Sequence, residues 1–463
     1  MAQEFDLVVR GGTVVDADGI AEADIGVSEG RIAAIARNVG RGVREVDARG
    51  RLVLPGGVDT HCHIEQVSGN GLLNADTFET ATRSAAFGGT TTCVSFAAQH
   101  KGQELIPVVE DYERRAQRGA LIDYAFHIIV SDPECGSLES DIVALAERGH
   151  RSLKIFTTYN IRLDDTKILQ VMAAARKAGD LICVHAENHA IIAHATERSL
   201  TAGNTAPKFH AVAHSRLAEA EAVARMIRFS EFLDQPVLLF HISTREGVEL
   251  VRQARQRGSR VRAETCPHYL LMTDDELDRP GLEGAKFMCS PPQRTPDDQE
   301  ALWRALALGD IQLVTSDHAP FRFDDTGKLA NGADAPFNRI ANGMPGLEVR
   351  MPLLFDAMVS SGRFDLCKFV EVTAAGPARI FGLRSKGVLR VGADADISIW
   401  DPDRKVTFGP DDLHDNVGYN PFEGRTVTGW PETVISRGDV IVEGGVISDG
   451  YGRGRRLELN PTV

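Results

Sequence analysis

Eight short apolar segments recur along the middle of the chain, and helical segments separate them. Two of the separating segments, residues 163–179 and 216–233, carry apolar residues at helical spacing. Strands that alternate with helices pair in parallel, and eight such units close into a (β/α)₈ barrel. The predicted strands are RLVLPGGVD (51–59), TTCVSF (91–96), YAFHIIV (124–130), LKIF (153–156), LICVH (181–185), VLLFH (237–241), VRAETC (261–266) and IQLVTSD (311–317).

The two ends of the chain have a different pattern, with short alternating strands joined by glycine-containing turns. This pattern covers residues 5–16 and 23–36, and it returns at 394–402 and 433–447. We therefore expect an α/β fold in which residues 55–384 form the barrel. Residues 1–54 and 385–463 would pair into one small β-sandwich beside it.

Charge and composition exclude several classes of partner. A net charge of -14 disfavours nucleic acid and anionic membranes. No apolar run approaches the ~20 residues that a membrane helix needs, and the N-terminus MAQEFDLVVRGG does not read as a signal peptide. Seven cysteines, an odd number without a CxxC pair, suggest reduced thiols. We expect a cytoplasmic protein that binds a small molecule.

Residues that commonly bind metals lie at the ends of five predicted strands. The first strand runs into His61 and His63, and the others end in Lys154, His185, His241 and Asp317. A single histidine after an apolar strand is more often a structural core residue. Here, however, the six residues lie at the same end of five different strands, where barrel active sites form. Imidazole and carboxylate groups suit Zn²⁺, Mn²⁺ or Co²⁺.

Lys154 is the unusual member, because it interrupts an apolar run that contains no acidic residue. A buried ammonium without a partner is costly, so the side chain either reaches water or is modified. Burial and nearby cations lower the pKa of a lysine amine. The neutral amine can add carbon dioxide, and the resulting carbamate has one oxygen for each of two metal ions.

Ten stretches resemble the amidohydrolase superfamily, and in particular its hydantoinase and dihydropyrimidinase group of cyclic amide hydrolases. The resemblance extends over nearly the whole chain. The matching stretches are LPGGVDTHCH, LKIFTTY, VHAEN, HIST, ETCPHYL, CSPPQR, SDHAPF, NGMPGLE, VGADADISIWDP and NVGYNPFEG.

This resemblance implies a binuclear metal centre. By position, His61, His63 and Asp317 would bind one divalent ion, and His185 and His241 the other. Carboxylated Lys154 would bridge the two ions. Zinc is the expected metal, and the ligand set also admits manganese or cobalt.

The resemblance also implies the roles of the remaining site residues. Water activated between the metals would attack the ring amide carbonyl, and Asp317 would move the proton to the leaving nitrogen. Tyr159 would donate a hydrogen bond to the developing oxyanion. Ser290 and Asn342 would hold the ureide edge of the substrate. The expected products are N-carbamoyl amino acids, made from dihydropyrimidines or 5-substituted hydantoins by a homotetramer.

Alternatives within the same fold stay open. Allantoinase and cyclic imide hydrolase use similar machinery. A dihydropyrimidinase-like scaffold without activity would lack metal ligands, whereas all six ligand residues are present in this chain. Dihydroorotase is disfavoured, because Glu65 stands where that enzyme has an arginine and would repel an acidic substrate.

Asp59 is expected either to orient a metal-bound histidine or to be a polar strand-end residue. The expected pocket walls are Leu72, Leu73, Phe96 and Tyr159.

Overall fold

The computed structural model describes residues 4–69, 71–448 and 450–461, whose strands form two separate sheets. In this part of the chain, eight parallel strands follow one another in sequence order around the first sheet, as predicted for the barrel. These strands are β6 (Gly57–Asp59), β7 (Thr90–Ala98), β8 (Asp123–Ile129), β9 (Ser152–Phe156), β10 (Leu181–His185), β11 (Val237–Leu239), β12 (Val261–Thr265) and β13 (Leu313–Val314).

The two edges of this sheet meet just beyond the ends of β6 and β13. Cys62 and His318 form a parallel bridge there, and the backbone N–H of His63 donates to His318 O at 2.6 Å. The barrel therefore closes at the level of the predicted metal ligands.

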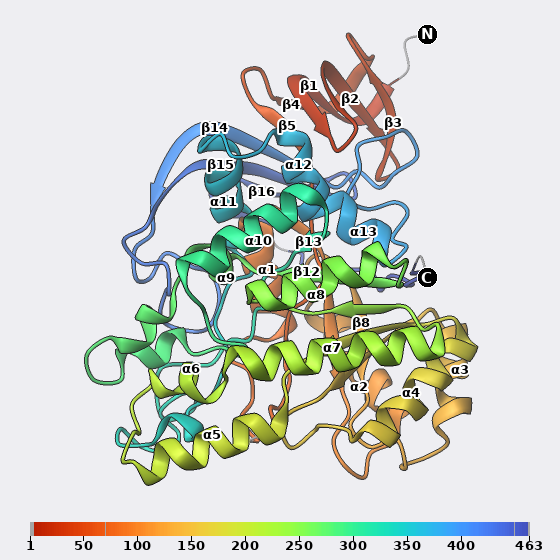
Figure 1. Cartoon of the computed structure of the whole chain (residues 1–463). Helices are drawn as coiled ribbons and strands as arrows, with labels where there is room; N and C mark the ends of the chain where they lie inside the picture. The colour runs from red at the N-terminus through yellow and green to blue at the C-terminus, as the bar shows by residue number, and fades with distance from the viewer. Residues whose placement is uncertain (1–3, 70, 449, 462–463) are drawn as a thin grey trace.

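Helices connect the barrel strands and cover the outside of the sheet, as Figure 1 shows for α3, α4, α7 and α8. The predicted helices are confirmed as α4 and α7. The α-helices are α1 (Phe78–Phe87), α2 (Leu105–Gly119), α3 (Leu138–Glu147), α4 (Asp165–Ala178), α5 (His189–Thr201), α6 (Phe209–Ala213), α7 (Arg216–Leu233), α8 (Arg245–Gln256), α9 (Pro267–Leu271), α10 (Pro296–Leu308), α11 (Arg350–Phe355), α12 (Leu366–Val370) and α13 (Gly376–Ile380). Short 3₁₀ segments occur at η1 (Asp274–Asp278), η2 (Glu283–Phe287) and η3 (Phe337–Arg339), and π-helical turns at η4 (Asp356–Ser360) and η5 (Glu371–Ala375).

Local signals set the bounds of α4. The side chain of Asp164 accepts a hydrogen bond from Lys167 N at 2.9 Å, which caps the first turn. Gly179 then ends the helix with a left-handed φ of 76°.

The strands of both chain ends form the second sheet, which Figure 1 shows in red and blue beside the barrel. Its order is β17-β16-β15-β14-β5-β1-β2-β3, with β4 on β1, and its smaller apolar core includes Val9, Ile25, Ile397 and Ile435. The strands are β1 (Glu4–Asp16), β2 (Gly19–Ser28), β3 (Arg31–Ala36), β4 (Arg41–Asp47), β5 (Leu52–Pro55), β14 (Ile397–Thr407), β15 (Thr426–Ser436), β16 (Asp439–Glu443) and β17 (Val446–Ile447).

The prediction that residues 51–59 form one barrel strand is wrong. The segment divides at Gly56, so that β5 lies in the second sheet and only β6 enters the barrel. Gly56 N donates to Asp396 O, whereas Gly57 N donates to Gly89 O. A side chain at Gly56 would collide with Thr91, so the chain changes sheets where only glycine fits.

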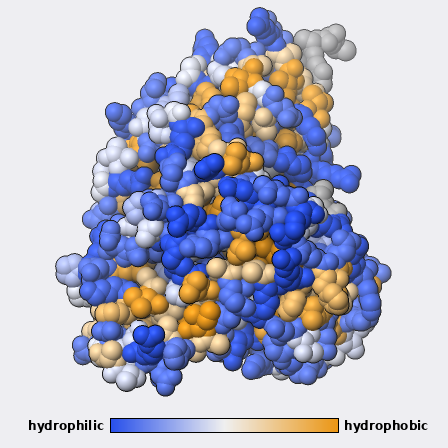
Figure 2. Space-filling model, viewed as in Figure 1, coloured by the Kyte–Doolittle hydropathy of each residue, from blue (hydrophilic) through white to orange (hydrophobic). Residues whose placement is uncertain are grey.

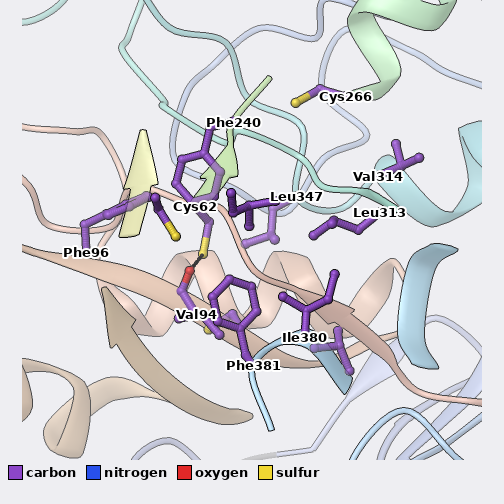
Figure 3. Close-up of a cluster of buried hydrophobic side chains, with 14 of the residues drawn as sticks. Cys62, Val94, Phe96, Phe240, Cys266, Leu313, Val314, Leu347, Ile380 and Phe381 are labelled. Atoms are coloured by element: carbon purple, nitrogen blue, oxygen red, sulfur yellow. Dashed lines mark hydrogen bonds between the residues drawn. The ribbon is translucent and has the colours of Figure 1, made fainter. Parts of the chain in front are cut away.

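The barrel strands and the helices that cover them share a packed apolar core, part of which Figure 3 shows. Cys62 points into this core, where its Sγ lies 3.6 Å from Val94 O, and it therefore turns away from the neighbouring histidines. On the face in Figure 2, polar side chains surround separate apolar patches. Within the described residues, none of the helices combines the length and hydrophobicity needed to cross a membrane.

Candidate active site

The predicted ligand residues meet at the carboxyl-terminal ends of the barrel strands. His185 is the last residue of β10, and His241 follows β11 by two positions. His61 and Asp317 lie just beyond β6 and β13. The prediction that Lys154 ends its strand is wrong, because Lys154 is the third of five residues in β9. Its backbone consequently lies deeper in the barrel than that of the histidines.

Three side chains form the first group of donor atoms. Nε2 of His61 and Nε2 of His63 lie 3.1 and 3.6 Å from Oδ1 of Asp317. His61 Nε2 is buried and makes no hydrogen bond of acceptable geometry within the described residues. A buried ring nitrogen without a hydrogen bond, beside a second imidazole and a carboxylate, fits a divalent metal ion.

His185 and His241 form the second group. Their Nδ1 and Nε2 atoms face each other at 2.9 Å, while the opposite nitrogen of His185 lies 2.8 Å from Glu187 Oε2. Burial lowers the pKa of both rings, so they are neutral near pH 7. Neutral imidazoles with converging nitrogens are the form in which histidine binds metal.

Lys154 lies beside both groups and is buried, with 1% of its surface exposed. Its Nζ lies 3.9 Å from the centre of the Phe240 ring and makes no hydrogen bond or ion pair in the described part of the chain. Burial lowers the pKa of this amine to about 8. The side chain does not reach water, which removes the simpler of the two explanations for a lysine in this strand.

Polar partners orient the histidine rings, and sequence reasoning assigned them no role. Glu264 makes a short contact with Nδ1 of His61, and Gln66 Oε1 lies 2.6 Å from Nδ1 of His63. Glu187 does the same for His185 and also contacts His214. Such partners leave the other ring nitrogen free for a metal. Glu264 lies in the stretch ETCPHYL and Glu187 in VHAEN, both of which resemble the family. This resemblance was the only sign of their role in the sequence.

Three site residues have left-handed backbone conformations. The φ angles are 69° at Tyr159, 41° at His241 and 46° at Asp317. Non-glycine residues rarely adopt such angles, which occur disproportionately at functional sites. The loops after β9, β11 and β13 are thus held in strained turns that direct these side chains.

A cavity of about 400 Å³ opens above the donor groups and is lined by all of the predicted substrate-binding residues, Tyr159, Ser290 and Asn342. The Tyr159 hydroxyl contacts Ser290 and Asn342, and burial raises the pKa of Tyr159 well above its ordinary value. Oδ1 of Asn342 is buried without a hydrogen-bond partner among the described residues. The wall therefore presents a phenol hydroxyl donor and a free carbonyl acceptor to a ligand.

Two expectations about the pocket are wrong. Leu72, Leu73 and Phe96 do not line the cavity. Phe96 lies beneath it and stacks on the His63 ring with centroids 4.3 Å apart. The carboxylate of Glu65 does not face a substrate either, because it accepts a hydrogen bond from Phe78 N at the start of α1. Glu65 therefore does not repel an acidic substrate at this cavity.

Asp59 acts on the backbone rather than on a histidine ring. Its Oδ1 accepts hydrogen bonds from His61 N at 3.1 Å and Ser316 N at 3.3 Å, and its Oδ2 lies 3.3 Å from Nε of Arg350. Of the two roles considered for Asp59, the structure supports that of a strand-end residue. It ties the loops after β6 and β13 together.

Comparisons with known proteins agree with this geometry. Residues 52–441 match the amidohydrolase family, and residues 1–49 match the N-terminal domain of the urease alpha subunit. A D-hydantoinase of Rhizobium radiobacter is 40% identical over 98% of this chain and 99% of its own.

Solved structures show the same likeness in three dimensions. One D-hydantoinase structure has a TM-score of 0.95 at 39% identity, covering 99% of each chain. A dihydropyrimidinase from Brevibacillus agri has a TM-score of 0.94 at 36% identity, covering 98% of this chain and 99% of that one.

Proposed function

The chain belongs to the amidohydrolase family of metal-dependent hydrolases, and on that premise we propose that it opens cyclic ureides. Its substrates would be 5-substituted hydantoins and dihydropyrimidines, and its products the corresponding N-carbamoyl amino acids. The observation that carries this proposal is the convergence of two donor groups beside a buried, unpaired Lys154 at the base of the cavity. The names of the similar proteins, D-hydantoinase and dihydropyrimidinase, support the ring class.

Membership of this family implies a binuclear metal centre, and the residues present fit one. His61, His63 and Asp317 would hold one ion, and His185 and His241 the other. Zinc is the proposed metal, with manganese or cobalt as substitutes. When bound, the two ions supply an activated water and polarise the carbonyl under attack.

We propose that Lys154 bridges the ions as a carbamate. The ammonium first loses a proton; the neutral amine then forms a nitrogen–carbon bond to carbon dioxide and releases a second proton, so that a buried cation becomes an anion. Burial already lowers the pKa of Lys154 to about 8, so a neutral fraction is available near neutral pH. The modification also removes the cost of an unpaired ammonium among Phe240 and its neighbours.

The remaining residues would bind the ring and move protons. The Tyr159 hydroxyl donates to the carbonyl oxygen as negative charge develops there. Asn342 accepts from a ring N–H through its free Oδ1, and Ser290 lies beside it on the same wall. Asp317 accepts the proton of the attacking water and delivers it to the leaving ring nitrogen.

Assembly and location complete the proposal. We propose a homotetramer in the cytoplasm. The exposed Leu217 and Phe232 of α7, at 70% and 77% exposure, are the type of surface that subunit contacts cover. The seven cysteines are free thiols, as expected in a reducing compartment. Light scattering of the purified protein tests the tetramer directly.

The decisive experiment is an assay of zinc-loaded protein on a 5-substituted hydantoin, dihydrouracil, allantoin and succinimide. Turnover of the first two, lost in Lys154→Ala together with bound zinc, supports the proposal. Turnover of only allantoin or succinimide would assign the machinery to another ring. No turnover and less than one zinc per chain would favour a scaffold without activity.

A further inference from the structure

The mouth of the cavity carries a positive charge that no carboxylate of residues 4–69, 71–448 or 450–461 neutralises. Arg162 is exposed and lines the cavity, and its Nη1 donates to Tyr159 O at 2.8 Å. This contact holds the guanidinium beside the residue proposed to bind the substrate carbonyl. Within the described residues, no ion pair involves Arg162, so its remaining N–H donors are free.

A neutral polar group lies beside this charge. His189 is the first residue of α5 and also lines the cavity. Burial, together with the charge of Arg162, lowers the pKa of His189, so its imidazole is neutral near pH 7 and adds no negative charge to the mouth. The amino-terminal end of α5 adds partial positive charge at the same position.

Acidic groups are nearly absent from the cavity wall. Asp317, among the metal ligands, is the only carboxylate that lines the cavity within the described part of the chain. Glu221, near the start of α5, contacts Asn188 and lies 3.2 Å from Arg225 rather than facing the cavity. Because Glu65 also faces elsewhere, the mouth is electrostatically prepared for an anion.

We propose that the mouth is a subsite for a carboxylate on the ring substituent, so that the preferred hydantoins carry an acidic side chain. This inference rests on the proposed function. With the ring held near Tyr159 and Asn342, a substituent of a few carbons would extend past Tyr159 toward Arg162. A cavity of about 400 Å³ has room for a ring and its substituent. Arginine suits this role because its planar fork can bind both carboxylate oxygens.

The test compares two substrates of nearly equal shape, 5-(2-carboxyethyl)hydantoin and 5-(2-carbamoylethyl)hydantoin, which differ in charge. We expect kcat/KM to favour the carboxylate about two- to fivefold at low salt, the range for an exposed ion pair. Salt should reduce this ratio. Arg162→Gln should bring the ratio to about one, and Arg162→Lys should retain part of it. Arg304→Gln, an exposed arginine of α10 outside the cavity, is the matched control.

The possible outcomes separate the two proposals. If the enzyme hydrolyses both hydantoins with equal kcat/KM, or if Arg162→Gln leaves the ratio unchanged, the subsite is wrong and the proposed function stands. If Arg162→Gln slows both substrates equally, the arginine only supports the Tyr159 turn, and the subsite is again wrong. If the wild-type protein hydrolyses neither of these hydantoins but opens dihydrouracil or another 5-substituted hydantoin, only the subsite is wrong; if it opens none of these rings, the proposed function fails and the subsite with it.

Discussion

Glu264 decides which nitrogen of His61 is free. The carboxylate is fully buried, and its Oε1 makes a short contact with Nδ1 of the ring. When Nδ1 carries the proton, Nε2 presents its lone pair toward Asp317, 3.1 Å away. Glu264 thus fixes both the tautomer and the orientation of His61, a proposed metal ligand.

Replacing this carboxylate by an amide tests its role. Glu264→Gln should weaken metal binding about 10- to 100-fold, because an amide fixes the His61 tautomer less strongly. Metal content after dialysis, followed by zinc titration of activity, measures the effect. Glu348→Gln is the control, since Glu348 is equally buried but contacts Ser84 and His414 instead. Equal metal loss in both variants would contradict the assignment.

Asp180 provides a residue-scale prediction about pH. Both of its carboxylate oxygens are buried without hydrogen-bond partners in the described part of the chain, and Arg151 Nη1 is 3.9 Å away. Burial raises the pKa of Asp180 to about 7, against about 4 in the unfolded chain. The folded state binds this proton more tightly, so its contribution to stability is present below pH 4 and is lost as pH rises to 7.

Asp180→Asn should therefore be more stable than the wild-type protein at pH 8, by about 2 to 4 kcal/mol in the free energy of unfolding. Near pH 4 the two proteins should be nearly equal. Urea unfolding at both pH values measures this difference, with Asp403→Asn on the exposed part of β14 as control. If the free energies of unfolding of the two proteins differ by the same amount at both pH values, the Asp180 carboxyl does not titrate between them.

At the scale of elements, Lys328 joins the two loops that hold the proposed substrate-binding residues. Its side chain is buried, and Nζ donates to Ala341 O at 2.9 Å and to Met288 O at 3.4 Å. Ser290 and Asn342 follow these carbonyls within two residues. Lys328 is therefore a positioning residue that sets the spacing of the cavity wall without touching a substrate.

Lys328→Met keeps the bulk of the side chain but removes both hydrogen bonds. We expect KM for the hydantoin to rise about tenfold, the effect of losing one to two hydrogen bonds, with a smaller change in kcat. Steady-state kinetics separate these two parameters, and Lys286→Met, which removes an ion pair with Glu283 and a contact with the Phe323 ring, neither of which lines the cavity, is the control. A tenfold fall in kcat with an unchanged KM would argue against a positioning role.

Some of these elements could be predicted from the sequence and others could not. Periodicity was sufficient for α4 and α7, whose apolar spacing and end signals are local. It failed at residues 51–59, because the change of sheet at Gly56 depends on a hydrogen bond to Asp396, far along the chain. Glu264 was missed for the same reason, since it meets His61 only after the barrel closes, whereas Gln66 and Glu187 lie three and two residues from their histidines.

At the scale of the whole molecule, a buried ionic cluster joins the barrel to the second sheet. Lys386 Nζ lies 2.6 Å from Asp123, the first residue of β8, and 2.7 Å from Asp396, just before β14. Asp394 lies 3.0 Å away, and Arg437, from the turn between β15 and β16, also pairs with Asp123. One ammonium thus connects segments from the middle and the end of the chain.

Lys386→Met should lower the stability of the protein without lowering its activity. The substitution leaves Asp123, Asp394 and Asp396 without their shared cation, and breaking a buried pair in this way costs about 3 to 5 kcal/mol. Asp123 begins β8 at the end of the barrel opposite the cavity, about 20 Å along the strand direction. Activity per folded molecule at 25 °C should therefore stay the same while the unfolding temperature falls. Calorimetry and hydantoin kinetics on the same sample measure both, with the exposed Lys405→Met of β14 as control. A loss of kcat that parallels the loss of stability would show instead that the joint between the sheets also shapes the catalytic end of the barrel.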